Sequence, residues 1–369
     1  MMSFKLRLTF MIVMTAALLF GFMHLINLDG LVYDFERLHI FLFNLCCGAT
    51  ILIYHTEKRK TLSTIGFCFF ILSMAFGIMA FLKLYIAAIV IAFLLFIIVE
   101  FIRWKHFSIF PKQFFSTQYS ISEKFHHAAL LCLSIGLLFS IAAIINEEFY
   151  PFLNLKMVIL NTFFLGFSFP ISLITMSVMF SFMQQRKTDK TNLSGQYSFW
   201  AINLGVIIFF VFILFDLALP QVFISSALFF SVILIFVLFY KQALKKQQKA
   251  FLSSGMFFLM ITAISGILYI YYKYYMEYDY EIGRIIIRAH AFTALYGWNL
   301  SGLAIICRYY DFPIRLHSRR VIVLHWITVL ILAPVGYHFL PIAILATVFY
   351  CIILYYVLLS DGEASKALA

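Results

Sequence analysis

A histidine inside an apolar, membrane-length segment is the residue of this chain best suited to chemistry. His290 lies in the run 288–302, Arg-Ala-His-Ala-Phe-Thr-Ala-Leu-Tyr-Gly-Trp-Asn-Leu-Ser-Gly. Hydrocarbon penalises charged or unpaired polar side chains, so such a histidine is a functional candidate. At helical spacing it shares one stripe with Thr293, Ala294, Gly297 and Ser301. An imidazole beside small side chains could hold a flat prosthetic group such as haem.

A second histidine, His39, opens another apolar segment just after Arg37. We expect His39 and His290 on different helices, each a turn or two below the outer surface. Two neutral imidazoles at matching depth can bind one iron from opposite faces of a haem. Arg37, Arg284 and Arg288 lie at the same level and could pair with haem propionates. In the alternative, the arginines extend to the interface and the histidines are hydrogen-bonded core residues.

The composition places these residues in a membrane protein. Of 369 residues, 64% are hydrophobic and 12% are charged, which no soluble domain of this length would show. Apolar runs of about 20 residues, the length that crosses a bilayer, recur along the whole chain. We therefore predict an all-α fold in a single transmembrane domain, 1–369, with twelve helices. They are expected at about 8–28, 38–56, 61–81, 84–103, 125–146, 155–183, 198–217, 221–240, 251–272, 285–307, 321–335 and 338–359.

The basic residues predict the orientation of these helices. With a cytoplasmic N-terminus, most of the 27 Lys and Arg residues fall in loops on the inner side. The exceptions are Arg37, Lys83, Lys156, Lys273, Arg284 and Arg288. The positive-inside rule requires this bias. An error in the number of helices would move the following basic loops to the outer side and remove it. We expect both termini in the cytoplasm, and the net charge of +11 indicates contact with anionic lipid rather than nucleic acid.

Two segments carry a resemblance to known haem proteins. Arg-x-His39 before an apolar run with Gly48 resembles the second helix of haem–copper oxidase subunit I, especially the cbb3 type. His290, followed by Gly297-Trp298-Asn299, is similar to the tenth helix of that family. His-Ala-Phe-Thr at 290–293 also resembles the late histidine motif of the NnrS family, twelve-helix haem proteins linked to nitric-oxide stress. The matched motifs cover about thirty residues.

The resemblance implies haem b, one group or two, in a bacterial inner-membrane protein with respiratory or cytochrome subunits as partners. His290 matches the position of the high-spin haem ligand and His39 that of the low-spin ligand. Phe292 stands where the oxidases have a second helix-10 histidine, and segments 155–183 and 198–217 contain no histidine for copper. We therefore expect no copper at the usual oxidase site. The activity would be electron transfer or handling of a diatomic gas such as nitric oxide. If the chain is an enzyme, it would be a haem-dependent oxidoreductase.

Other residues are weaker candidates. The predicted helices hold almost no acidic side chain, which argues against a proton pump. His126, His127 and His325 lie near the inner face and could line a second haem or quinone pocket between segments 125–146 and 321–335. A pH-sensitive helix end is the alternative for the adjacent pair. The six cysteines have no CxxC spacing, so thiolate metal clusters are not expected.

Two function classes other than haem binding remain open from the sequence. Twelve helices with both termini inside are common in secondary transporters, although no internal repeat and no paired broken helices are visible. A structural subunit of a respiratory complex without a cofactor is the third hypothesis. An absorption spectrum separates the haem hypothesis from both.

Overall fold

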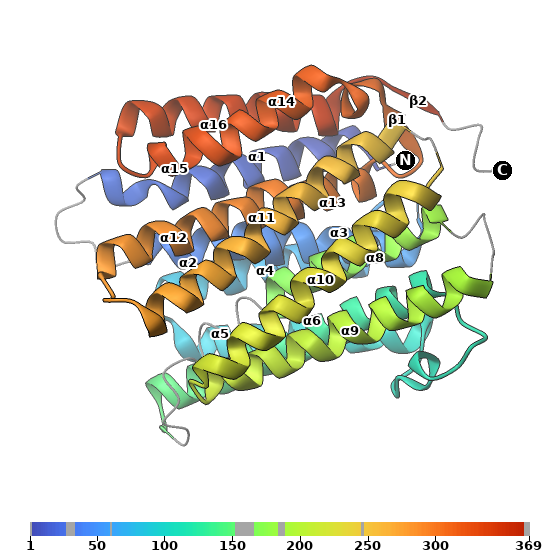
Figure 1. The fold of residues 1–369 in the computed structure, drawn as a ribbon, viewed down its shortest axis with the longest axis horizontal. Helices are drawn as coiled ribbons and strands as arrows, with labels where there is room; N and C mark the ends of the chain where they lie inside the picture. Colours follow the sequence, from blue (N-terminus) through green and yellow to red (C-terminus); the bar gives the residue numbers. More distant parts are fainter. Residues whose placement is uncertain are drawn as a thin grey trace.

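The computed structural model describes residues 2–26, 34–59, 61–151, 166–183, 189–244 and 247–364. Its helices run side by side along the long axis of the molecule (Figure 1). Within these residues, eleven helices are long and apolar enough to cross a membrane: Phe4–Gly21, Arg37–Glu57, Thr64–Phe81, Tyr85–His106, Ile121–Glu148, Gly166–Met183, Leu193–Leu214, Ala218–Gln242, Gln248–Tyr275, Arg319–Gly336 and Leu340–Leu359. The architecture is that of an all-α, multi-pass membrane protein.

The chain divides more finely into the α-helices and strands that Figure 1 labels and short 3-10 and π-helical segments, written η. The helices of the first half are α1 (Phe4–Gly21), η1 (Met23–Leu25), α2 (Phe35–Ile40), η2 (Phe41–Ala49), α3 (Thr50–Glu57), α4 (Thr64–Phe81), α5 (Tyr85–His106), η3 (Lys112–Phe114), α6 (Ile121–Glu148) and α8 (Phe169–Met183). The second half has α9 (Asp189–Leu214), α10 (Ala218–Gln242), α11 (Gln247–Tyr275), α12 (Tyr280–Phe292), η5 (Thr293–Asn299), α13 (Leu300–Cys307), η6 (Ile314–His317), α14 (Arg319–Ile327), η7 (Thr328–Leu332), α15 (Ala333–Gly336), α16 (Leu340–Leu354) and η8 (Tyr355–Leu359), with strands β1 (Asp311–Pro313) and β2 (Gly362–Ala364).

Eleven of the predicted segments correspond to these apolar helices. The predicted tenth segment, 285–307, is helical throughout as α12, η5 and α13. It is missing from the apolar set because polar side chains such as His290 and Asn299 interrupt its hydrophobic run. Parts of the predicted first and sixth segments, 27–28 and 155–165, lie outside the described residues.

Local backbone chemistry sets the helix ends. Lys58, Lys83 and Asp216 adopt positive φ angles of 51°, 59° and 52°, and this left-handed conformation stops a helix and turns the chain. The predicted division near Lys83 is therefore real. At the start of α6, the Ser120 side chain accepts from the backbone N–H of Glu123, whose carboxylate accepts from the N–H of Ser120. This reciprocal capping satisfies two N–H groups that the helix leaves unpaired.

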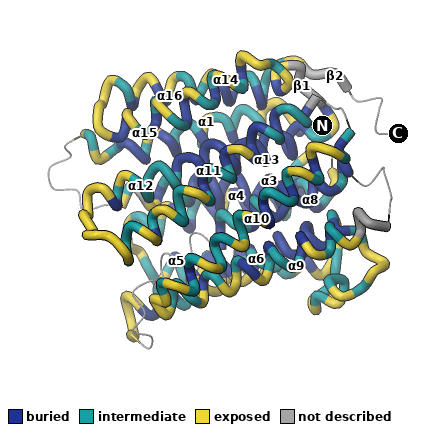
Figure 2. The backbone as a smooth tube through the Cα atoms, in the orientation of Figure 1, coloured by how far each residue is buried: buried dark blue, intermediate teal, exposed yellow. Residues whose placement is uncertain are grey.

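Three helical segments form the centre of the bundle. The apolar windows of Arg37–Glu57 and Gly166–Met183 are 83% and 78% buried, whereas the other apolar helices are at most 50% buried. All residues of α13 are buried, as Figure 2 shows in dark blue. α6 packs against the segment before α8 so closely that a side chain on Gly136 would overlap the backbone of Gly166. η2 and η5 are π-helical, a widened form of helix that is frequent at functional sites.

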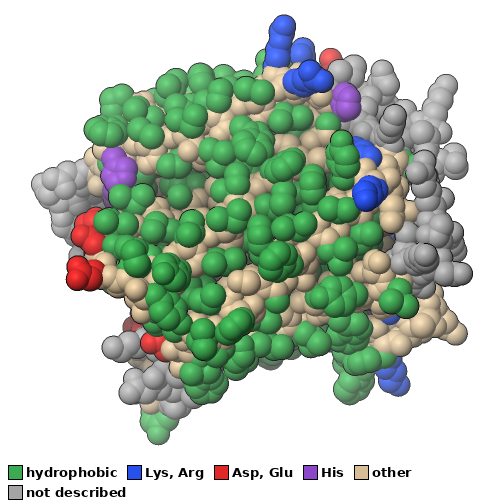
Figure 3. Space-filling model, in the orientation of Figure 1, with side chains coloured by type: hydrophobic (Ala, Val, Ile, Leu, Met, Phe, Trp, Pro, Cys, Tyr) green, Lys and Arg blue, Asp and Glu red, His purple; other side chains and the backbone are tan. Residues whose placement is uncertain are grey.

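The chain begins and ends its helical part at the same end of the molecule. Arg7 of α1 donates from Nη1 to the carbonyl of Leu358 in η8, at 2.8 Å. β1 and β2 pair antiparallel beside this contact, with Asp311 opposite Ala364. In the face drawn in Figure 3, most Lys and Arg side chains lie toward this end, most acidic ones lie at the opposite end, and hydrophobic side chains cover the area between.

Candidate functional site

His290 is held against α11 by its ring nitrogen Nδ1. This atom lies 2.9 Å from the backbone carbonyl of Thr262. Because a carbonyl can only accept, Nδ1 carries the proton and, in the neutral ring, Nε2 carries the lone pair. Thr262 and Thr293 also join their hydroxyl groups at 2.9 Å, which fixes α11 against the helix that carries His290. The packing thus selects the tautomer in which Nε2 can bind a metal.

His290 lines a cavity with a volume of about 330 Å³. Side chains of α8, α9, α10, α11, α12 and η5 form its walls, and most of them are apolar. His290 is the one histidine among the described residues that line it. Sites for cofactors and drug-sized molecules span about 300–1,000 Å³, so this cavity is at the lower end of that range.

The cavity has polar groups at two places on its wall. Asp216, Lys273 and Tyr274 form the first group, and Asp216 is exposed, so the cavity reaches the surface there. Tyr274 donates its hydroxyl to Asp216, and Lys273 Nζ lies 3.5 Å from the same carboxylate. The Tyr274 hydrogen bond, followed by the charge of Lys273, holds the pKa of Asp216 below its usual value of 3.8.

The second polar group lies deep in the bundle and joins the three central segments. Asn299 of η5 donates from Nδ2 to Asn44 Oδ1 at 3.1 Å and to Ser168 Oγ at 2.9 Å. The neighbouring Trp298 donates to Ser172 Oγ at 2.8 Å. Asn299, Ser168, Trp298 and Ser172 all line the cavity. These bonds pair the amide nitrogen of Asn299 and the indole of Trp298 at a depth where an unpaired polar group is costly, whereas Asn299 Oδ1 has no partner among the described residues.

His39 lies against other neighbours than those of His290. Its ring stacks on Tyr296 with 6.4 Å between centroids, and Gly21 of α1 lies beside it. His39 is not among the described residues that line the cavity. The pairing of His39 and His290 on one iron remains a prediction, without a shared cavity to support it.

The three arginines predicted to pair with propionates also lie away from the described cavity wall. Arg37 pairs with Asp34 at 2.8 Å and Arg284 with Glu281 at 3.3 Å. Arg288 stacks over the ring of Tyr337, 3.7 Å from its centroid. The acidic partners Asp34 and Glu281 are exposed, whereas Tyr337 is buried.

The adjacent histidines His126 and His127 of α6 contact different partners. His126 donates from Nε2 to the Thr56 hydroxyl at 2.8 Å and stacks on His55, with 5.4 Å between centroids. His127 accepts from Arg103 at 3.3 Å, and Arg103 is paired with Glu100. The two rings diverge because successive side chains on a helix point about 100° apart.

His325 lies elsewhere, on α14, and does not share the contacts of His126 and His127. Its Nε2 donates to the backbone carbonyl of Tyr296 at 2.6 Å, and Phe251 and Phe258 pack on its ring. Tyr296 belongs to η5, where the π-helical turn alters the regular hydrogen-bond pattern of the backbone. The contact gives His325 a structural role in supporting this turn.

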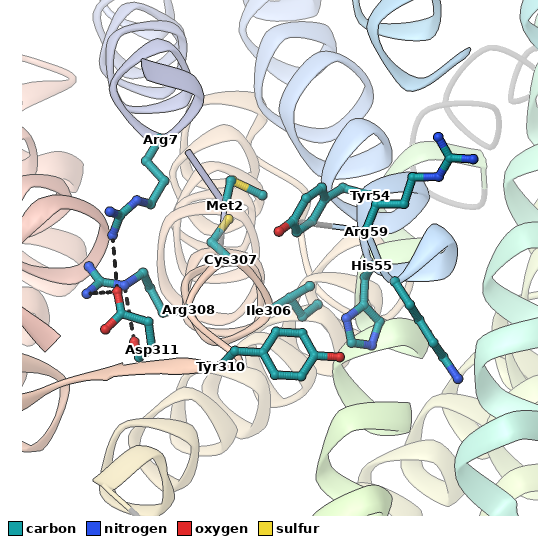
Figure 4. Close-up of a pocket in the computed structure, with 11 residues that line it drawn as sticks. Met2, Arg7, Tyr54, His55, Arg59, Ile306, Cys307, Arg308, Tyr310 and Asp311 are labelled. Carbon is teal, nitrogen blue, oxygen red and sulfur yellow. Dashed lines mark hydrogen bonds and ion pairs between the residues drawn. The ribbon is translucent and has the colours of Figure 1, made fainter. Parts of the chain in front are cut away.

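A smaller polar site at the end of the bundle where the two termini lie is drawn in Figure 4. Arg308 pairs with Asp311 at 2.6 Å, and Arg7 reaches the same carboxylate at 3.5 Å. Arg308 also donates to the carbonyl of Leu358 at 2.7 Å. The cavity between these residues and Tyr54 has a volume of about 10 Å³, which is room for about one water molecule. This site therefore ties α1, α13 and η8 together rather than holding a cofactor.

Several residues of the site were not predicted from the sequence. Thr262 acts through its backbone carbonyl, which no residue type reveals. Asn44 and Ser168 belong to the predicted second and sixth segments, and a polar residue within an apolar run was a usable signal for both. Among the described residues, no group of three His, Cys, Asp or Glu side chains could hold a metal ion. An axial haem ligand requires only one such side chain.

No family model, curated protein or solved structure matches this chain.

Proposed function

We propose that this chain is a haem-binding integral membrane protein that handles a diatomic gas such as nitric oxide. The observation that carries the proposal is His290, the one histidine on the described wall of the 330 Å³ cavity, with its Nδ1 bound to the Thr262 carbonyl. This arrangement presents Nε2 as the electron-pair donor, as a haem-ligating histidine requires.

The proposed setting is the inner membrane of a bacterium, with twelve spanning helices and both termini in the cytoplasm. In this topology α12, η5 and α13 together form the tenth span. The contact between Arg7 and Leu358 supports it, since it joins the first and last spanning helices at one end. The gathering of basic side chains toward that end in Figure 3 agrees with the positive-inside rule.

The residues of the cavity fit a haem in part. Apolar walls suit the porphyrin faces, and Lys273 is the one cation on the described wall that could pair with a propionate. Arg37, Arg284 and Arg288 do not line the cavity, so we do not assign them to the propionates. The bound haem would supply an iron that binds the gas or exchanges an electron.

The number of histidines on the described cavity wall favours gas handling over electron transfer. Electron-transfer haems are commonly held by two axial side chains, whereas a gas-binding haem keeps one axial position open. His290 has no second histidine opposite it on the described cavity wall. We therefore propose one five-coordinate haem b per chain, with His39 outside the iron's coordination.

The test is the absorption spectrum of the purified full-length chain in detergent. We expect a Soret band that shifts when carbon monoxide or nitric oxide is added to the reduced protein. His290→Gly should remove the band, and added imidazole should restore it by filling the space of the missing ring. His338→Ala, at an exposed turn, is the matched control and should leave the spectrum unchanged.

A colourless protein after growth with added haem would overturn the proposal. The cavity would then bind another apolar molecule, as in a transporter. A Soret band that does not shift when gas is added, and that persists in His290→Gly, would show that the haem binds at another site.

A further inference from the structure

The imidazole of His290 shares its hydrogen-bond acceptor with a second donor. The Ser265 hydroxyl donates to the carbonyl of Thr262 at 2.9 Å, and the same carbonyl accepts from His290 Nδ1 at 2.9 Å. Ser265 Oγ lies 3.4 Å from Nδ1, so both donors approach one side of the acceptor. A carbonyl oxygen has two lone pairs, and each donor weakens its attraction for the other.

From this arrangement we infer that Ser265 is a positioning residue that tunes the electron-donating strength of His290. The inference rests on the proposed function, because it concerns the histidine as an iron ligand. A stronger hydrogen bond at Nδ1 makes the imidazole a better donor at Nε2. Ser265 draws on the same carbonyl and so keeps that hydrogen bond weaker than it would otherwise be.

Gly266, the next residue on α11, leaves the space that the ring occupies. A methyl group at this position would lie 3.1 Å from His290 Cε1 and 3.3 Å from Nδ1. These distances are shorter than an ordinary carbon contact of about 3.5–4.0 Å, so the ring would have to shift. Gly266 thus lets the ring approach α11 closely enough to reach the Thr262 carbonyl.

The decisive experiment compares Ser265→Ala with Ser225→Ala in the haem-loaded protein. Ser225 is the matched control because its hydroxyl also donates to the carbonyl three residues earlier, Val222, but lies outside the described cavity wall. In Ser265→Ala, His290 is the one side chain among the described residues that still donates to the Thr262 carbonyl. We expect the iron–histidine stretching frequency in the resonance Raman spectrum of the ferrous protein to rise, and the reduction potential to fall. Ser225→Ala should match the wild type.

Gly266→Ala provides the opposite perturbation. Its methyl group should push the ring from the carbonyl and lower the iron–histidine frequency. Identical frequencies and potentials in wild type, Ser265→Ala and Gly266→Ala would overturn the inference while the haem itself remained. Absence of haem from the wild type would contradict the proposed function instead.

The effect of Ser265 on the His290 ring can also be measured without haem. In protein labelled with nitrogen-15 at histidine, Ser265→Ala should shift the Nδ1 resonance of His290 and leave the other histidine signals in place. An unshifted resonance would show that Ser265 does not act on the imidazole.

Discussion

Asn299 joins three membrane-spanning segments through one amide group. Its Nδ2 donates to Asn44 and to Ser168, and its side chain is 1% exposed. A buried polar group that loses its partner costs about 1–3 kcal/mol, more than the hydrogen bond itself contributes. The cluster therefore fixes how the second, sixth and tenth segments pack.

Asn299→Ala should lower the free energy of unfolding by about 1–3 kcal/mol, because Asn44 Oδ1 and Ser168 Oγ lose their donor. Thermal unfolding in detergent measures this. Asn203→Ala is the control, since Asn203 donates to the Phe199 carbonyl in its own helix. Equal effects of the two changes would show that the cluster has no special role.

A second residue-scale prediction separates structural from ligating histidines. His325→Phe should leave the Tyr296 carbonyl without its donor and destabilise the protein by about 1–3 kcal/mol. Haem content should stay at the wild-type level, because we assign His325 to the backbone of η5. Loss of haem from a folded His325→Phe protein would instead support the original prediction of His325 as a ligand.

At the scale of elements, the helical hairpin α9–α10 forms one wall of the cavity. Its turn contains Asp216, which contacts Tyr274 and Lys273 of α11. At the other end of the hairpin, Lys249 donates to the carbonyls of Tyr240 and Ala243. Asp216 is therefore the residue that fastens the turn of the hairpin to α11.

The fastening at Asp216 should depend on pH. Its pKa is lowered in the folded protein, so its contribution to stability is present above the unfolded value of 3.8 and is lost as pH falls through the lower folded value. We expect Asp216→Asn to be less stable than the wild type near pH 6, with the difference shrinking below about pH 4. Melting temperatures across this range measure it. A difference that does not change with pH would contradict the assigned charge interaction.

The sequence predicted the helices well and the site only in part. Hydropathy is a property of each segment alone, so the runs that became α4, α5 and α10 were visible without a structure. The cavity arises where six elements pack sideways, and hydropathy says nothing about which helices are neighbours. His290 could be identified because a polar side chain is costly in hydrocarbon, whereas no sequence feature distinguishes Asp216 from other acidic residues at helix ends.

For the whole molecule, the proposed orientation can be tested at two exposed positions. Thr117 lies in the loop before α6 and Glu277 in the turn before α12. In intact cells, a membrane-impermeant thiol reagent should label Glu277→Cys and reach Thr117→Cys only after permeabilisation. The unsubstituted chain, with its six native cysteines, gives the background. Reversed labelling would invert the topology and put the Asp216 mouth of the cavity in the cytoplasm.

We propose that one histidine, His290, holds one haem. The most direct measurement is the haem content per chain of the purified protein, His290→Ala and His39→Ala, determined by pyridine haemochrome analysis. The account predicts one haem b in the wild type, the same amount in His39→Ala, and none in His290→Ala. Haem retained in full by His290→Ala, or absent from the wild type, would contradict it.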